Sequence, residues 1–137
     1  MTIEAVVGAS FEHSFRFTQE QVVQFAILTG DDNPLHLDAG YAATTPFKRP
    51  IIHGMLGATV FTKVLGTEYP GHGSIYLNQT LDFLRPMFVE TDYIAVFTIK
   101  ALHAEKHIAE ITTEIKDATT KKVVTRGVAT MINKEKF

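Results

Sequence analysis

The chain has 137 residues, a size typical of one globular domain, so we expect one domain over residues 1–137. Its 13 Lys and Arg against 15 Asp and Glu give a formal net charge of -2, without a run of like charge for nucleic acid or membrane surfaces. The absence of Cys excludes disulfides, thiolate metal ligands and a Cys nucleophile. With no signal-peptide pattern and no membrane-length apolar run, we expect a cytoplasmic protein that binds neither nucleic acid nor membranes.

The first part of the chain predicts a strand at Phe11–Phe17 and then a helix over Thr18–Leu28. Thr18 followed by Gln21 is a capping box, and Gly30 is a typical helix stop. Four residues share one face of this helix: Val22, Phe25, Ala26 and Thr29. Asp31 should therefore follow a helix end.

A loop rich in Asp, Pro and Thr follows over residues 31–50, with a short helix expected from Asp38. A second helix is predicted from His53 to Leu65, before Gly66. Apolar residues lie on nearly every side of it: Met55, Leu56, Ala58, Val60, Phe61, Val64 and Leu65. This pattern predicts a buried helix.

After the second helix the hydrophobic period becomes two. Ile75, Leu77, Leu81 and Phe83 alternate with polar residues or Tyr76, which is typical of a half-buried strand. Strand-like runs follow at Tyr93–His103, His107–Asp117 and Lys122–Ile132. Short turns require antiparallel neighbours. We therefore expect an α+β fold with an antiparallel sheet of about five strands curled around one helix, and a homodimer that covers an open sheet edge.

The densest polar cluster lies between Gly30 and Asp38. Asp31 and His36, five residues apart around a Pro-set turn, could converge on one water, since carboxylate and imidazole are the usual proton-transfer groups near neutral pH. The alternative is structural, because Asp and Asn before Pro favour turns and Asp38 could cap the next helix.

A second cluster runs from Arg49 to Met55, where the chain enters the buried helix. Gly54 would lie in the first turn, where backbone N–H groups lack intrahelical partners and the helix dipole is positive. A substrate carbonyl could approach this N–H closely and develop negative charge there. The alternative is that Gly54 only permits tight packing of helix against sheet.

These two clusters resemble the signature of the MaoC-like (R)-specific enoyl-CoA hydratases. The family motif Asp-x-Asn-Pro-hydrophobic-His is matched by Asp31, Asn33, Pro34, Leu35 and His36, and a His53-Gly54-Met55 helix start follows. The similarity continues through Arg49-Pro50 and Gly73–Leu77. It implies a hotdog fold, in which a curved antiparallel sheet wraps a long central helix.

The resemblance also implies an activity: reversible syn hydration of a trans-2-enoyl-CoA to the (R)-3-hydroxyacyl-CoA. Asp31 and His36 would be the catalytic pair and Gly54 the oxyanion donor. Asn33 and His53 would contribute to substrate binding, with Asn33 also orienting the loop. Thr62 and Leu65 would line the acyl pocket and favour short chains. No metal or redox cofactor is expected, and coenzyme A is part of the substrate.

Several alternatives stay open. Asp31, His36 and His53 could form a metal set, although the apolar helix and the missing Cys argue against it. Lys48, Arg49 and Arg85 could contact coenzyme A phosphates or only solvent. Other activities would be dehydration of 3-hydroxyacyl groups on acyl carrier protein, thioester hydrolysis by a hotdog thioesterase, or non-catalytic acyl-thioester binding. The pathway, polyhydroxyalkanoate monomer supply or fatty acid metabolism, is not specified by the sequence.

Overall fold

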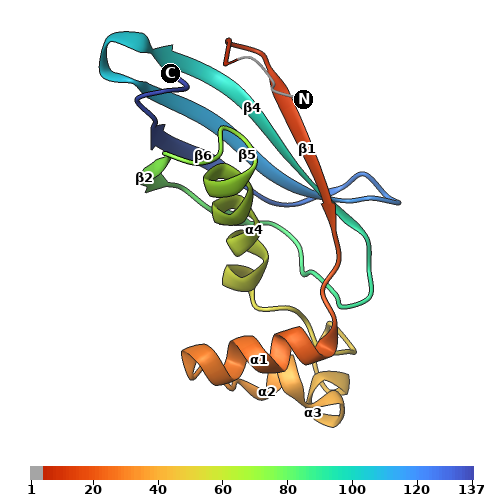
Figure 1. The fold of residues 1–137 in the computed structure, drawn as a ribbon. Coiled ribbons are helices and arrows are strands. Elements are labelled where there is room, and N and C mark those ends of the chain that lie inside the picture. Colours follow the sequence, from red (N-terminus) through yellow and green to blue (C-terminus); the bar gives the residue numbers. More distant parts are fainter. Residues whose placement is uncertain (1–4) are drawn as a thin grey trace.

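The longest helix lies against an antiparallel sheet in this computed structural model, which describes residues 5–137 (Figure 1). The helices are α1 (Gln19–Thr29), α2 (Pro34–Leu37), α3 (Ala39–Ala43) and α4 (Gly54–Thr67), with a 3-10 turn at Ala104–Lys106. The strands are β1 (Ser10–Phe15), β2 (Ile75–Gln79), β3 (Asp82–Phe83), β4 (Tyr93–His103), β5 (Ile108–Asp117) and β6 (Val123–Ile132).

The sheet has the strand order β1-β4-β5-β6-β2, and the short β3 also pairs with β6. Every pair is antiparallel, as the short turns predicted. The α+β class is confirmed, with six strands in place of about five, because the predicted strand at Ile75–Phe83 is divided into β2 and β3.

The core forms where α4 meets the inner face of the sheet. Six residues of α4 are buried: Leu56, Gly57, Val60, Phe61, Val64 and Leu65. The fully buried Phe61 packs edge-on against Phe97 of β4, with ring centroids 5.8 Å apart. Alternate residues of β4 and β5 complete this face: Ala95, Phe97 and Ile99, then Ala109, Ile111 and Ile115. The apolar pattern of α4 is thus explained by burial against the sheet.

The sequence predicted that α4 is buried on nearly every side, but one face of the helix is exposed. Met55 is 58% exposed, and Thr59 and Thr62 are also exposed. The sheet covers one face only, so the opposite face lacks cover within the described chain.

The predicted orientation of the segment from Ile75 to Phe83 is wrong. Ile75 and Leu77 are 62% and 52% exposed, while Tyr76 and Gln79 are half-buried, and a register shift interrupts the pairing between Tyr76 and Asn78. Tyr76 donates to Oε1 of Gln79 over 2.7 Å, and burial raises the pKa of Tyr76 to about 12. The bulge and this polar pair explain why alternation alone gave the wrong face.

The segment between β1 and α4 holds α1, α2 and α3, which lie together below the sheet near the start of α4 (Figure 1). The capping box is confirmed, since Thr18 Oγ1 accepts from the Gln21 N–H and Gln21 Oε1 accepts from the Thr18 N–H. Asp38 caps α3, as expected. The helix α2 was not predicted.

Within residues 5–137, no helix combines the length and apolar character needed to cross a membrane.

Candidate active site

Asp31 lies on the loop that leaves α1. Gly30 ends the helix in the left-handed region, at φ 80°, and its N–H donates to the Ala26 carbonyl over 2.9 Å. Asp31 donates its own N–H to Thr29 Oγ1, and its Oδ1 accepts from the Asn33 N–H at 3.4 Å. The carboxylate is 54% exposed. It is therefore held at its base by local bonds and open to a ligand.

His36 lies on α2, one turn after a polar cap. The Asn33 side chain accepts from the Leu35 N–H at 3.1 Å, and Pro34 occupies the first turn. Through this cap Asn33 orients the loop, as the sequence predicted. A contact between Asn33 and the substrate stays a prediction. Gln19 of α1 donates to the His36 carbonyl over 3.0 Å and fixes α2 against α1.

The tautomer of a neutral His36 ring follows from one contact. Its Nδ1 lies 2.8 Å from the carbonyl oxygen of Ile51, which can only accept a hydrogen bond. Nδ1 therefore carries the hydrogen, and Nε2 keeps its lone pair free to accept a proton. The Ile51 N–H donates to the Leu35 carbonyl over 3.3 Å. The backbone of Ile51 therefore contacts α2 through both its N–H and its carbonyl.

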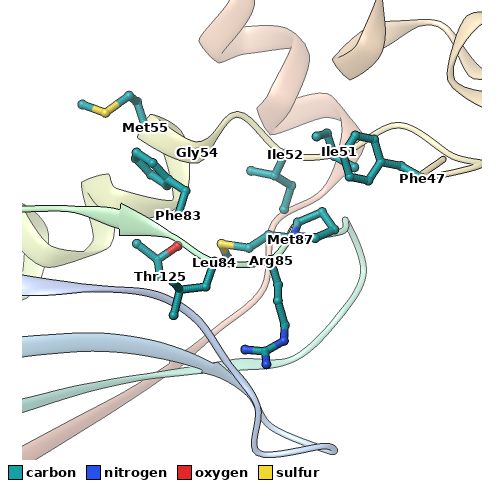
Figure 2. Close-up of a pocket in the computed structure, with 11 residues that line it drawn as sticks. Phe47, Ile51, Ile52, Gly54, Met55, Phe83, Leu84, Arg85, Met87 and Thr125 are labelled. Atoms are coloured by element: carbon teal, nitrogen blue, oxygen red, sulfur yellow. The ribbon is translucent and has the colours of Figure 1, made fainter. Parts of the chain in front are cut away.

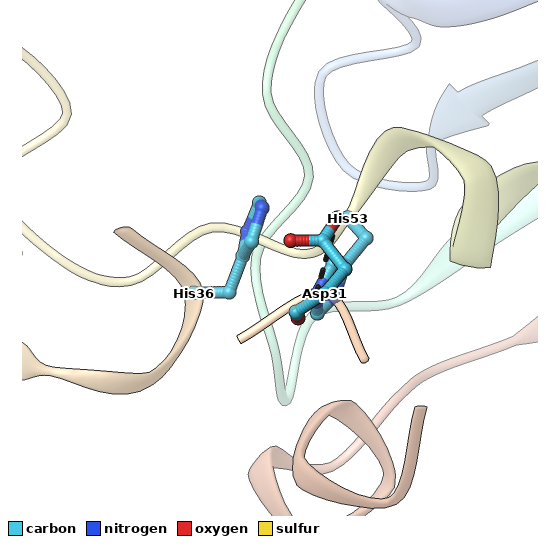
Figure 3. A group of neighbouring side chains, drawn as sticks. All are labelled: Asp31, His36 and His53. Atoms are coloured by element: carbon cyan, nitrogen blue, oxygen red, sulfur yellow. Dashed lines mark hydrogen bonds and ion pairs between the residues drawn. The ribbon is translucent and has the colours of Figure 1, made fainter. Parts of the chain in front are cut away.

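His53 lies next to both Asp31 and His36 (Figure 3). Its Nε2 lies 2.9 Å from the Asp31 carbonyl oxygen and 4.0 Å from Asp31 Oδ2. Its ring stacks on His36, with centroids 3.8 Å apart and an interplanar angle of 26°. Asp31 and His36, five residues apart in the sequence, are thus neighbours in space, as the motif predicted.

Asp31, His36 and His53 each offer one donor atom, all within 4.8 Å of one another, so a metal ion is a geometric alternative. However, His36 Nδ1 and His53 Nε2 each face a backbone carbonyl. A shared ion would also have to lie on an in-plane lone pair of each ring, and two rings stacked 3.8 Å apart at 26° direct those lone pairs along separate lines. The arrangement suits hydrogen bonding to a water better than coordination of an ion.

Gly54 is the first residue of α4, directly after His53. Among the described residues no acceptor contacts its N–H, and the positive end of the helix dipole lies here. A Cβ on Gly54 would come within 2.8 Å of the Phe83 ring, so the packing explanation also applies. Phe83 is itself half exposed, whereas a Cβ on Gly57 would come within 2.7 Å of Sδ of the buried Met87.

A cavity of about 450 Å³ opens beside Gly54 (Figure 2). Its lining is mostly apolar and comes from the loop before α4, from the start of α4 and from the segment after β3. Representative side chains are Phe47, Ile51, Met55, Phe83, Leu84 and Met87. The sequence alternation suggested that Phe83 faces the core, so its place in the cavity wall was missed; the apolar pair Phe83-Leu84 directly before Arg85-Pro86 was the available signal.

The remaining predicted residues lie in different surroundings. Thr62 is exposed on α4, while Leu65 is fully buried in the core and reaches no open surface in the described chain. The Arg49 guanidinium stacks on the Phe88 ring at 3.8 Å, and Arg85 bonds to the Val123 carbonyl while it also lines the cavity. Roles for these residues in binding acyl chains or phosphates stay predictions.

The family of MaoC like domains matches residues 3–127 of this chain. The chain belongs to the MaoC-like family. It is 50% identical to the (R)-specific enoyl-CoA hydratase of Aeromonas caviae over 109 residues, which cover 80% of this chain and 81% of the relative. It is 38% identical to the (R)-specific enoyl-CoA hydratase of Rhodospirillum rubrum over 125 residues, 91% of this chain and 85% of that one.

Similarity to solved structures agrees with the family assignment. The (R)-hydratase of A. caviae, described as involved in PHA biosynthesis, superposes with a TM-score of 0.89 at 44% identity, over 93% of this chain and 96% of that chain. The hotdog fold implied by the sequence resemblance is confirmed.

Proposed function

We propose that this MaoC-like protein is an (R)-specific enoyl-CoA hydratase, a lyase that adds water reversibly to a trans-2-enoyl thioester. The observation that carries the proposal is the meeting of an exposed carboxylate, Asp31, with the neighbouring imidazole of His36, whose Nε2 lone pair is free. The 50% identical relative from A. caviae carries the same activity in its name.

The reaction needs a base for water, a proton source for the α-carbon and a donor for the developing enolate. In our proposal Asp31 and His36 hold one water between them. Its oxygen adds to the β-carbon and one of its protons goes to the α-carbon on the same face, which gives syn addition. The thioester oxygen gains negative charge during this step and accepts a hydrogen bond from the Gly54 N–H.

The proposed chemistry proceeds with the side chains and the backbone alone, so it requires neither a metal nor a redox cofactor. Coenzyme A enters as part of the substrate. The cavity beside Gly54 supports the binding of an apolar or extended thioester chain, because its walls are mainly apolar and it adjoins the oxyanion donor. We retain short acyl chains as the expected preference, although Thr62 and Leu65, which the sequence suggested as pocket residues, do not line this cavity.

A homodimer is part of the proposal. The edge strand β2 has one side without a partner in the described sheet, and Ile75 and Leu77 on it are exposed. Met55 on α4 adds apolar surface on the uncovered face of the helix. A second copy would cover this surface, and sedimentation should give a mass near twice 15.2 kDa. The lack of Cys favours a cytoplasmic location.

The test is an assay of crotonyl-CoA hydration, in which the loss of the enoyl thioester absorbance measures the reaction. We expect turnover with crotonyl-CoA and a product of (R) configuration. No absorbance loss by folded protein with short or medium chains would refute the proposal. A free-thiol assay run beside it separates hydration from thioester hydrolysis, because hydration leaves coenzyme A attached. The same measurement with an acyl carrier protein substrate identifies the preferred carrier.

A further inference from the structure

His53 lies between the proposed catalytic pair, Asp31 and His36, and the proposed oxyanion donor, the Gly54 N–H. Its backbone caps α4 with φ -54° and ψ 130°, and its carbonyl accepts from the Gly57 N–H at 3.2 Å. Gly54, the proposed oxyanion donor, is the next residue in the chain. The position of His53 therefore sets the direction in which the first turn of α4 begins.

The ring of His53 contacts two other rings and makes a hydrogen bond at one nitrogen. Its Nε2–H donates to the Asp31 carbonyl over 2.9 Å, joining residues 22 positions apart. His36 stacks on the ring at 3.8 Å, and Phe25 of α1 meets it edge to face at 4.9 Å. One side chain thus contacts the Asp31 loop, the His36 ring and α1 together.

We infer that His53 is a positioning residue that holds Asp31 and His36 in register with the Gly54 N–H. This inference rests on the proposed hydratase function. The hydrogen bond fixes the main chain of Asp31, and the stacked face restricts rotation of the His36 ring, so that Nδ1 stays on the Ile51 carbonyl and Nε2 faces the water. A side chain that is 3% exposed has little surface for the substrate contact expected from the sequence.

A second observation separates positioning from simple packing. His53 Nδ1 is buried and has no hydrogen-bond partner among residues 5–137. A buried polar atom without a partner lowers the free energy of unfolding, because it loses its bonds to water on folding. A carbon ring of the same shape would fill the site without this cost, so packing alone does not explain an imidazole here. The hydrogen bond from Nε2–H to the Asp31 carbonyl explains why an imidazole occupies this position.

Two substitutions at His53 test the hydrogen bond and the ring stacking separately. His53→Phe keeps a ring that can stack on His36 and Phe25 but removes the Nε2–H donor. His53→Gln keeps an amide N–H that can reach the Asp31 carbonyl but removes the ring. The same changes at His72, which is exposed in a loop after α4, serve as matched controls and should leave kinetics unchanged. Measurements are kcat and KM with crotonyl-CoA, thermal unfolding, and the 15N chemical shifts of the His36 ring.

We expect kcat to fall about 10- to 100-fold in both variants, with KM within about twofold, because small misplacements of reacting groups cost rate more than affinity. His53→Phe removes the unpaired nitrogen but also the donor to the Asp31 carbonyl, and it adds a larger ring, so kcat is compared per folded molecule at a temperature where both proteins are folded. In His53→Gln the His36 shifts should move from those of a single Nδ1–H tautomer toward a mixture.

Three results would overturn the inference: wild-type kcat with wild-type His36 shifts in both variants, a loss confined to KM, or a loss of activity that only follows a lower unfolding temperature. The ring shifts do not depend on turnover. If the wild-type protein lacks hydratase activity, the proposed function fails, yet the shifts still show whether His53 holds His36 in one tautomer.

Discussion

The α4–sheet region and the segment of residues 18–50 are stabilised by different kinds of contact. The first contributes almost all of the buried apolar cluster, from Phe61 of α4 to Ile115 of β5. The second places only Val22 in that cluster and packs the partly buried Phe25 and Leu37 against it. Caps and single hydrogen bonds, such as Gln19 to the His36 carbonyl, hold the rest of its geometry. Asp31 and His36 lie in the second region. The proposed catalytic geometry is therefore fixed by a few directional bonds, which can be changed without loss of the core.

The largest expected effect comes from the proposed catalytic pair. Asp31→Asn and His36→Gln should each lower kcat about 10²- to 10⁴-fold, since each removes one partner in proton transfer. The unfolding temperature should stay close to wild type, because the Asp31 carboxylate is exposed and neither Asp31 nor His36 belongs to the buried apolar cluster. Steady-state kinetics and thermal unfolding on the same samples test this.

Wild-type kcat in either variant would show that the pair does not carry the reaction. A large drop in unfolding temperature would instead contradict the comparison, because it would make residues 18–50 part of the stabilising core.

The next largest effect should come from the core itself. Phe61→Ala removes a fully buried ring that packs on Phe97, and such deletions cost about 3–5 kcal/mol of unfolding free energy. The fraction that remains folded should hydrate crotonyl-CoA at close to the wild-type rate. Urea unfolding gives the first quantity, and activity per folded molecule gives the second. A selective loss of rate in folded protein would show that the core controls the site directly.

The smallest effect is expected at the junction of the two regions, where Arg16 follows β1 and pairs with Asp92 over 2.8 Å. Arg16 holds the pKa of Asp92 below its ordinary value of 3.8, mainly through the hydrogen bond. The pair therefore stabilises the fold above that pH, and its contribution is lost as the pH falls through the lowered pKa. Exposure keeps the contribution small.

Arg16→Met should return the pKa of Asp92 toward 3.8, measured by NMR titration of the carboxyl carbon. The small difference in unfolding temperature from wild type should be present at pH 7 and vanish in acid. A difference that persists at the lowest pH would mean that the Arg16 stem, not its charge, joins the two regions.

The sequence predicted the regular parts of the fold because local signals and final environment agree there. The capping box at Thr18, the stop at Gly30 and the three long strands β4, β5 and β6 with their short turns all appear in the structure close to their expected bounds. Prediction failed for Ile75 and Leu77, whose outward orientation follows from a bulge that periodicity does not reveal.

The candidate site was predictable in its residues but not in its connections. The motif placed Asp31 near His36, and the spacing placed Gly54 in a first helical turn. The contact of His36 with the Ile51 carbonyl could not be predicted, because any residue at position 51 has a carbonyl. The stacking of His53 was hidden for a similar reason, since it depends on how α2 approaches α4.

The dual use of Ile51 has a consequence for how such a site can change. Its main chain holds the His36 tautomer, while its side chain lines the cavity beside Gly54. A substitution at this position alters the shape offered to an acyl chain but leaves the carbonyl in place. Substrate range and proton chemistry are thus separable at a single residue, so position 51 is a place to vary chain-length preference without retuning the catalytic base.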